Sequence, residues 1–170
     1  MDYVMKICLL GDGGVGKTSL VYRFIENRFS TDFKSTLGVN LLKRVVSIDD
    51  DKVSVQIWDL GGQDAYKKLR KLYLEGSQGA LLVFDVTSKT SFERLYDWTN
   101  SFRDVQSGAP MLLIGNKIDL VNEVQVDEET AKKYAAENQM EYISTSAKTG
   151  EKVEQSFKTL ISRIIKLQTI

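Results

Sequence analysis

The sequence predicts an α/β domain with a six-stranded, mostly parallel sheet, one antiparallel edge strand, and helices on both faces. Short apolar runs alternate along the chain with longer amphipathic runs, as in parallel strands joined by helices. Several of these runs are apolar throughout, which is typical of strands covered on both faces. With 170 residues, 42% hydrophobic and 27% charged, the chain has the size and composition of one domain spanning residues 1–170.

The N-terminal part of the chain supplies the first strand, the first helix and a hairpin. The run VMKICLL at residues 4–10 predicts a buried strand. The next apolar residues recur at helical spacing: Leu20, Val21, Phe24 and Ile25. Residues 39–48 and 52–58 flank the acidic turn Asp49–Asp51 and predict an antiparallel hairpin, which gives the sheet its antiparallel edge strand.

Three more strands alternate with three helices in the rest of the chain. The strands are predicted at residues 79–86, 111–116 and 140–145. Residues 127–138 predict a helix whose first turn is acidic, as suits the helix dipole. One further helix is marked by Phe92, Leu95, Phe102 and Val105. The last is marked by Val153, Phe157, Leu160, Ile161 and Ile164.

Composition excludes several kinds of chemistry. The chain has no histidine, so histidine-based acid–base catalysis and histidine metal ligands are excluded. Its single cysteine, Cys8, cannot form an intramolecular disulfide and fits a reducing compartment, so we expect a cytoplasmic protein with Cys8 buried. The formal net charge of +0 gives no electrostatic argument for nucleic-acid binding.

No membrane anchor is visible in the sequence. No apolar run approaches the roughly 20 residues that a membrane span needs. The start MDYVMK does not resemble a signal peptide, and the end LQTI carries no prenylation signal. Association with a membrane would require a lipidated tail after Ile170.

The stretch GDGGVGKT at residues 11–18 fits the pattern G-x-x-x-x-G-K-[ST] between a predicted strand and a predicted helix. Glycines allow successive backbone N–H groups to point at phosphate oxygens, and the helix adds its positive N-terminal end. Lys17 can reach the outer phosphates, and the Thr18 hydroxyl can bind Mg²⁺. The alternative is a glycine-rich turn that only caps a helix. The predicted phosphate site comprises Gly13, Gly14, Val15, Gly16, Lys17, Thr18 and Ser19.

The motifs NKID (116–119) and SAK (146–148) each follow a predicted strand and predict a guanine site. The Asp119 carboxylate can accept hydrogen bonds from guanine N1–H and its exocyclic amino group, which adenine lacks. Asn116 can brace the pocket, and the Ala147 N–H can reach the guanine O6. For NKID alone, the alternative is an exposed turn. The predicted base site comprises Asn116, Lys117, Asp119, Leu120, Ser146, Ala147 and Lys148.

These motifs, in this order and spacing, make the chain similar to the small GTPases of the Ras superfamily over essentially all its residues. The resemblance implies the G-domain form of the P-loop NTPase fold. The stretches VFDVTSKTSFERLYDW and STLGVN are most similar to the Rab branch, whereas WDLGGQ is closer to the Arf form. The chain lacks both the N-terminal extension of Arf proteins and the helical insert of Rho proteins.

The resemblance also implies roles for residues outside the two motifs. Thr36 matches the threonine that completes Mg²⁺ coordination when a γ-phosphate is present, and Asp59 matches the acidic group that holds Mg²⁺. Gly62 matches the glycine whose N–H meets the γ-phosphate, and Phe29 matches the aromatic residue that packs on the base. Gln63 matches the residue that orients the attacking water. The implied catalytic residues are Gln63, Lys17, Thr36 and Gly62, and the implied metal ligands are Thr18, Thr36 and Asp59.

A GTPase of this kind is expected to be a monomer that switches between GTP-bound and GDP-bound states. Loss of the γ-phosphate should loosen residues 30–38 and 60–75. Expected partners are a GTPase-activating protein, a guanine-nucleotide exchange factor and effectors. Arg28 and Arg70 are candidates for an internal catalytic arginine, although a solvated charge is the interpretation we favour for both.

Two other functions fit the phosphate loop. A metabolic kinase would need a second substrate pocket and an arginine-rich lid, and the sequence has no such insertion. A domain that binds nucleotide without turnover would not need Lys17, Thr18 and Gln63 together. Arf-like behaviour would retain the enzyme but change its partners.

Overall fold

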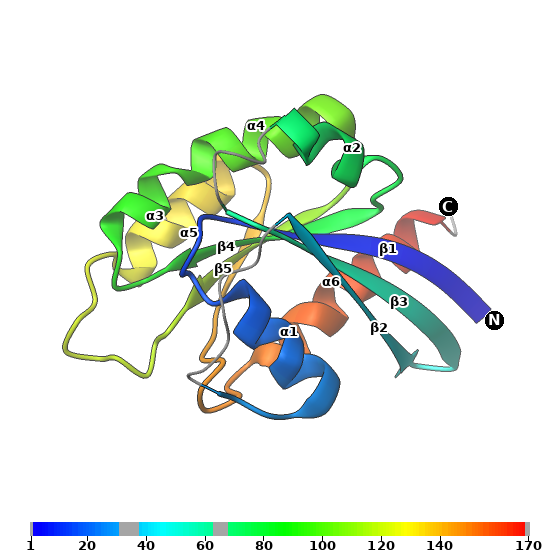
Figure 1. The fold of residues 1–170 in the computed structure, drawn as a ribbon, viewed down its shortest axis with the longest axis horizontal. Helices are drawn as coiled ribbons and strands as arrows, with labels where there is room; N and C mark the ends of the chain where they lie inside the picture. Colours follow the sequence, from blue (N-terminus) through cyan, green and yellow to red (C-terminus); the bar gives the residue numbers. More distant parts are fainter. Residues whose placement is uncertain (1, 31–37, 63–67, 169–170) are drawn as a thin grey trace.

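The computed structural model describes residues 2–30, 38–62 and 68–168. One six-stranded sheet runs through the molecule in the order β2-β3-β1-β4-β5-β6 (Figure 1). Its strands are β1 (Asp2–Leu10), β2 (Val39–Ile48), β3 (Asp51–Leu60), β4 (Gly79–Asp85), β5 (Met111–Asn116) and β6 (Glu141–Ser144). The pair β2–β3 is antiparallel and every other pair is parallel, which confirms the predicted fold class.

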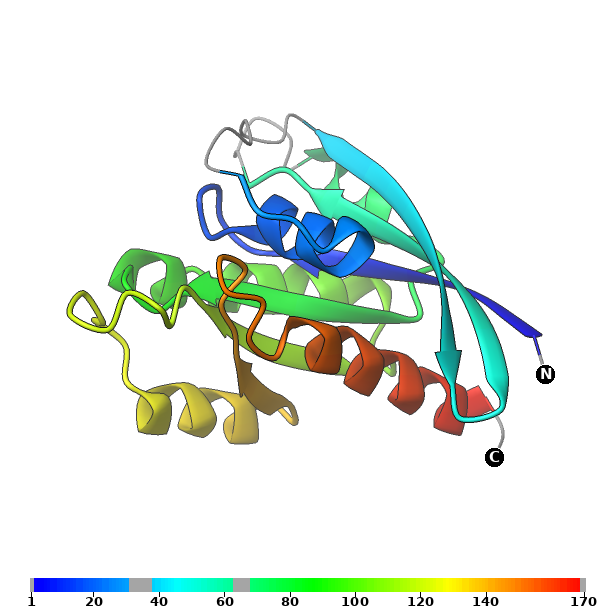
Figure 2. The same ribbon diagram turned by 90° about the horizontal axis from the view of Figure 1, so that it is seen from below.

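Helices cover both faces of the sheet (Figures 1 and 2). One face carries α1 (Lys17–Glu26) and α6 (Val153–Gln168), whose buried Phe24 and Phe157 rings stack 4.1 Å apart. The other face carries α2, α4 and α5, with Trp98 and Phe102 buried beneath them. The bounds of the remaining helices are α2 (Arg70–Leu74), α3 (Lys89–Glu93), α4 (Leu95–Val105) and α5 (Glu128–Glu137).

The prediction of a single helix through residues 92–105 is wrong, because the structure contains two helices, α3 and α4, in this region. They meet at Arg94, whose φ of −80° and ψ of −7° depart from the ideal α-helical values. Ser88 caps α3, since its side chain accepts a hydrogen bond from the Ser91 N–H. The short α2 was not predicted from apolar spacing, because five residues are too few to show a helical period.

Hydrogen bonds join the start of β2 to the end of β3. This point adjoins residues 30–38 and 60–75, the two segments that are expected to loosen when the γ-phosphate is lost. Val39, which begins β2, pairs with Leu60, which ends β3. One residue beyond this pair, the Gly61 N–H donates to the Gly38 carbonyl at 2.6 Å. The chain therefore enters β2 and leaves β3 at one hydrogen-bonded point.

Cys8 lies in the middle of β1 and is fully buried, as predicted. Its Sγ hydrogen-bonds with Ser77 Oγ at 2.8 Å. Burial raises the pKa of the Cys8 thiol to about 11, because the thiolate would lose its solvation, although the Ser77 hydrogen bond opposes this shift. The thiol is therefore neutral over the physiological range.

We expect the Cys8 thiol of the folded protein not to react with a disulfide reagent such as DTNB at pH 8, and to react fully after unfolding in urea. The thiolate is the nucleophile, and a raised pKa delays its formation until the pH approaches about 11. Val121→Cys provides the control, because Val121 is 73% exposed and a thiol there should react at once. Rapid modification of two thiols in folded Val121→Cys would contradict the buried placement of Cys8.

Candidate functional site

The predicted motifs converge at the carboxyl ends of the strands. The phosphate loop follows β1, Gly62 follows β3, NKID follows β5 and SAK follows β6 (Figure 1). In an open parallel sheet this edge is where ligands bind. The fold therefore brings the two sequence-predicted sites, about a hundred residues apart in the chain, to one place.

The phosphate loop turns into α1 at Gly16. Gly16 has a φ of +97°, a left-handed conformation that disfavours residues with a side chain. A Cβ at Gly16 would lie 2.3 Å from Asn116 Nδ2, so the loop packs closely against the base-site motif. Val15 is buried beneath the loop, whereas Gly13 and Gly14 are exposed.

Lys17, the first residue of α1, is buried and its ammonium group turns back onto the phosphate loop. Its Nζ donates to the Gly11 carbonyl at 2.6 Å and to the Asp12 carbonyl at 3.1 Å. Burial lowers the pKa of Lys17 to about 8, and the nearby Asp59 and Asp12 carboxylates oppose this shift. The loop therefore holds a cation that has lost most of its water, at the position predicted to meet phosphate oxygens.

Thr18 and Asp59 are brought together although they are 41 residues apart. The Thr18 hydroxyl donates to Asp59 Oδ2 at 2.6 Å. A hydroxyl and a carboxylate are hard oxygen ligands, the type that Mg²⁺ prefers, and Mg²⁺ sites in nucleotide-binding proteins use few protein ligands plus phosphates and water. Among the described residues no cluster of three or more acidic, cysteine or histidine side chains could hold a metal alone. The Thr18 hydroxyl and the Asp59 carboxylate therefore fit a Mg²⁺ ion that also binds a phosphate group of the ligand.

Gly62 lies against the phosphate loop. A Cβ on Gly62 would approach the Gly13 nitrogen to 2.0 Å and the Asp12 carbonyl carbon to 2.4 Å. Only a glycine fits at this separation, so the backbone after β3 contacts the peptide between Asp12 and Gly13.

Asn116 connects the phosphate loop to the base-site loops. Its buried side chain donates from Nδ2 to the Val15 carbonyl at 3.0 Å. Its Oδ1 accepts from the Thr145 hydroxyl at 3.1 Å and from the Ala147 N–H at 3.2 Å. The Ala147 N–H, predicted to meet the guanine O6, thus donates to Asn116 in this structure.

Lys117 and Asp119 lie on either side of the same turn. Lys117 Nζ donates to the Gly14 carbonyl at 2.7 Å and pairs with Asp85 Oδ2 at 2.9 Å. Asp119 Oδ1 accepts from the hydroxyl of the buried Ser146 at 2.7 Å. One oxygen of the Asp119 carboxylate is thus fixed by SAK, which sets the orientation of the group.

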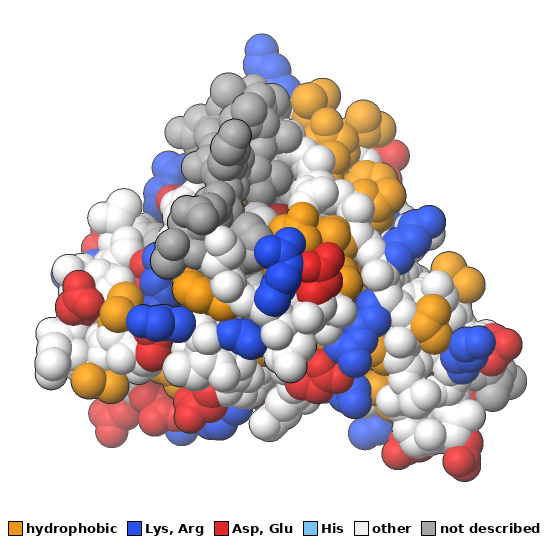
Figure 3. Space-filling view, turned by 60° about the horizontal axis from the view of Figure 1, so that its bottom comes forward, with side chains coloured by type: hydrophobic (Ala, Val, Ile, Leu, Met, Phe, Trp, Pro, Cys, Tyr) orange, Lys and Arg blue, Asp and Glu red, His pale blue; other side chains and the backbone are white. Residues whose placement is uncertain are grey.

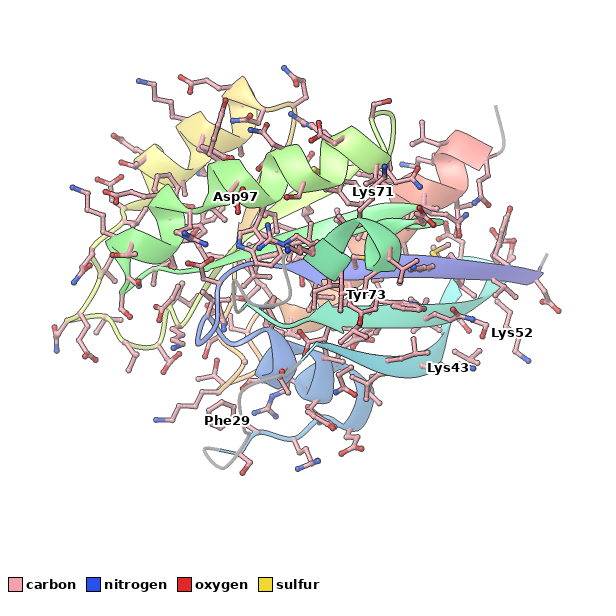
Figure 4. The ribbon with its side chains drawn as sticks, turned by 45° about the horizontal axis from the view of Figure 1, so that its top comes forward. Phe29, Lys43, Lys52, Lys71, Tyr73 and Asp97 are labelled. Atoms are coloured by element: carbon pink, nitrogen blue, oxygen red, sulfur yellow. The ribbon has the colours of Figure 1, made fainter. Side chains whose placement is uncertain are left out.

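The remaining predicted residues are less closely connected. Leu120 closes the NKID turn, with its N–H donating to the Lys117 carbonyl at 3.1 Å. Phe29 is half-buried beyond the end of α1 (Figure 4), Ser19 is half-buried within α1, and Lys148 is exposed. Thr36 and Gln63 lie outside the described residues, so their assigned roles remain predictions.

Three site residues were missed by sequence reasoning. Arg23 of α1 donates from Nε to the Ala147 carbonyl at 2.9 Å and also reaches the Lys148 carbonyl. Asp85 pairs with Lys117, and its position at the end of β4 was a usable signal. The Asp12 carboxylate accepts from the Trp98 indole N–H at 2.9 Å, and no motif indicates this contact.

The preferred interpretation of Arg70 as a solvated charge is wrong. Arg70 is only 4% exposed, and its Nη1 donates to Asp97 Oδ2 at 3.0 Å and to Ser101 Oγ at 3.1 Å. The exposed Arg28 contacts the Glu26 carboxylate and lies over the Tyr22 ring at 4.7 Å. Arg70 is therefore bound to α4, and Arg28 is bound to residues of α1.

The site contains a buried lysine in a glycine-rich loop, a Thr–Asp pair, and a carboxylate that lies beyond the carboxyl ends of neighbouring strands. These features define a nucleoside-phosphate-binding domain of the P-loop class. A family model described as "Ras family" matches residues 6–166. The chain is 39% identical to the GTP-binding protein ypt3 of Schizosaccharomyces pombe over 167 residues, which are 98% of this chain and 78% of the relative. It is 40% identical to the Ras-related protein RABA2a of Arabidopsis thaliana, covering 98% of this chain and 77% of the relative.

A third relative, the human Ras-related protein Rab-8B, is 36% identical over 96% of this chain and 80% of its own length. The chain belongs to the Ras family, in its Rab branch. It is therefore a small GTPase switch that hydrolyses GTP, as the sequence predicted. Proteins of this family use Mg²⁺ with their nucleotide.

Basic and acidic side chains are interspersed on the face shown in Figure 3, in keeping with the formal net charge of +0. Among the described residues, no helix has the length and hydropathy of a membrane span.

We expect Gly16→Ala to lower the free energy of unfolding by about 1–3 kcal/mol, because alanine is strained at this positive φ and its Cβ would displace Asn116. Gly108→Ala, away from the nucleotide site, is the matched control. It has no positive φ and no described atom within 4 Å of its Cβ, so a change within about 0.5 kcal/mol is expected. Urea unfolding at one fixed, saturating GDP concentration measures both values. Equal destabilisation of the two variants would contradict the close packing at Gly16.

Proposed function

We propose that residues 1–170 form a single G domain that binds GDP and GTP together with Mg²⁺ and hydrolyses GTP slowly through the residues described above. The observation that carries this proposal is the Asn116 side chain, which ties the phosphate loop to SAK and so places Lys17 and Asp119 in one continuous site. A phosphate site suits a guanine nucleotide when the same site also contains a carboxylate that can accept hydrogen bonds from the edge of the purine base.

Nucleotide binding would use the loop and both base-site motifs. Backbone N–H groups of Gly13 to Ser19 would receive phosphate oxygens, and Lys17 would exchange its loop carbonyls for the outer phosphates. Asp119 would accept from the guanine N1–H and amino group, while Phe29 and the Lys117 stem would flank the base. Leu120, Ser146, Ala147 and Lys148 would complete the pocket wall.

Hydrolysis would depend on positioning and charge compensation rather than on covalent catalysis. Thr18 and Asp59, with Thr36, would hold Mg²⁺, which supplies charge neutralisation at the phosphates when bound. Gln63 would orient the attacking water, and the Gly62 N–H would meet the γ-phosphate. Lys17 would stabilise the charge that develops as the terminal phosphoryl group leaves.

The described arginines support a slow intrinsic rate. Arg70 is held by Asp97 and Ser101 of α4, and Arg28 is held by Glu26, so each guanidinium already has a partner within the protein. Ras-type enzymes without an internal catalytic arginine hydrolyse GTP on the order of 10⁻⁴ s⁻¹, and an arginine from an activating protein adds roughly 10⁵-fold. We therefore propose control by a GTPase-activating protein, a nucleotide-exchange factor and effectors.

The cellular setting of the switch is part of the proposal, and the Rab-branch relatives support it. We propose a monomer that acts in the cytoplasm, takes no nucleic acid as a ligand, and reaches membranes only through an added lipid. Loss of the γ-phosphate would release residues 30–38 and 60–75, and effectors would recognise the form that retains it.

Single-turnover hydrolysis tests the proposed activity. With Mg²⁺ present, we expect phosphate release from GTP on the order of 10⁻⁴ s⁻¹ without any added acceptor, and none from ATP at the same concentration. Chelation of Mg²⁺ should abolish release, because Thr18 and Asp59 would lose the ion they share with the phosphates. Release from ATP at the GTP rate, or only with an added alcohol acceptor, would instead indicate a kinase-like enzyme.

Asp119→Asn should weaken GDP binding by about 100-fold and reduce the preference for GDP over IDP to less than about tenfold. Inosine lacks the exocyclic amino group, and a hydrogen bond to a charged group contributes about 1.5–3 kcal/mol, so the normal Asp119 should favour GDP by about 10- to 100-fold. Calorimetry with both nucleotides measures the ratio. Asp104→Asn, on the exposed surface of α4, is the control and should leave it unchanged. A wild-type chain that binds GDP and IDP equally would remove Asp119 from the base site.

A further inference from the structure

Asp12 connects the phosphate loop to α3 and α4. Its carboxylate accepts from the Trp98 indole N–H at 2.9 Å and from Arg94 Nε at 3.1 Å. Its main-chain carbonyl accepts from Lys17 Nζ at 3.1 Å. The side chain of Asp12 is thus fixed from outside the loop, and its backbone helps to place the lysine that meets phosphate.

The other side of Trp98 holds the start of α2. The Arg70 guanidinium lies over the Trp98 ring, 3.5 Å from the ring centroid, and Trp98 is fully buried. Arg70 is also bound to Asp97 and Ser101, two residues of α4. Figures 1 and 4 show α2 lying alongside α4, the helix that carries Asp97. The Trp98 indole therefore contacts both regions. Its N–H binds Asp12 of the phosphate loop, and its ring face packs against Arg70 of α2.

The chain returns to the phosphate loop at Gly62. The backbone of Gly62 rests on the peptide between Asp12 and Gly13, and the segment that begins there leads to Arg70. Asp12 is thus linked to the region after β3 at two points, through the Gly62 backbone and through Trp98 and Arg70. No motif in the sequence and no feature of the proposed hydrolytic machinery requires the second link.

We propose that Asp12, Trp98 and Arg70 are positioning residues that set the preference of this site for GTP over GDP. The proposal rests on the proposed function. With the start of α2 held beside the phosphate loop, less conformational entropy is lost when a γ-phosphate fixes the Gly62 backbone. GDP has no γ-phosphate and gains nothing from this arrangement. The link therefore raises GTP affinity selectively.

The test is the ratio of affinities for GDP and for a non-hydrolysable GTP analogue, guanosine 5′-(β,γ-imido)triphosphate, measured by calorimetry with Mg²⁺. Trp98→Phe keeps a ring beneath Arg70 but removes the N–H donor, and it should lower the affinity for the analogue about tenfold relative to GDP. A purely structural role would weaken both nucleotides equally. Trp58→Phe is the matched control, because Trp58 packs near Tyr73 of α2 and makes no hydrogen bond to Asp12. Its ratio should not change.

Asp12→Ala removes the acceptor and keeps the Trp98 ring in place, so it decides the question if Trp98→Phe does not fold. Tryptophan fluorescence provides a second measurement that leaves Asp12, Trp98 and Arg70 unchanged. The chain has two tryptophans, so Trp98 is the sole reporter in Trp58→Phe, and its emission should shift when GDP is exchanged for the analogue.

Addition of Asp12→Ala to this background should abolish that shift. Unchanged ratios in both link variants, an equal fall in Trp58→Phe, or constant Trp98 emission would overturn the proposal. A wild-type chain that binds neither guanine nucleotide would instead refute the proposed function on which it rests.

Discussion

The site depends on the buried amide of Asn116. Its nitrogen holds the loop that follows β1, and its oxygen holds the loop that follows β6, while Asn116 itself ends β5. A side chain with one donor group and one acceptor group is needed, because the two loops present a carbonyl on one side and donors on the other. An aspartate in this place would leave the Val15 carbonyl without its donor and add a buried charge.

Charge in the site is arranged by the same close packing. Lys17 is buried among backbone carbonyls with Asp59 and Asp12 nearby, and Lys117 is paired with Asp85. Groups of the protein therefore hold both lysine side chains in place. A bound nucleotide can take over this role, through its phosphates at Lys17 and through its base at Lys117. The local cost of burying the Lys17 cation would be offset by a bound, highly charged phosphate chain.

Much of this arrangement could be predicted from the sequence, because strands that are apolar throughout and a glycine-rich turn between a strand and a helix carry local signals. Contacts between distant segments were harder to predict. The burial of Arg70 depends on Asp97 and Trp98, which lie 27 and 28 positions further along the chain, and a run of basic residues contains no sign of such partners. The carboxylate of Asp12 occupies a variable position of the loop pattern, so the motif does not indicate that Trp98 binds it. The roles of Thr36 and Gln63 stay predictions.

The hydrogen bond from Gly61 to Gly38 has a mechanical consequence. It makes the start of β2 and the end of β3 a single anchorage, supported by the long antiparallel ladder behind it. A pull on the backbone at one of these glycines is passed directly to the other, since the ladder resists shear between its strands. The backbone before β2 and the backbone after β3 therefore share one anchored point, and a displacement of either at this point is a displacement of both.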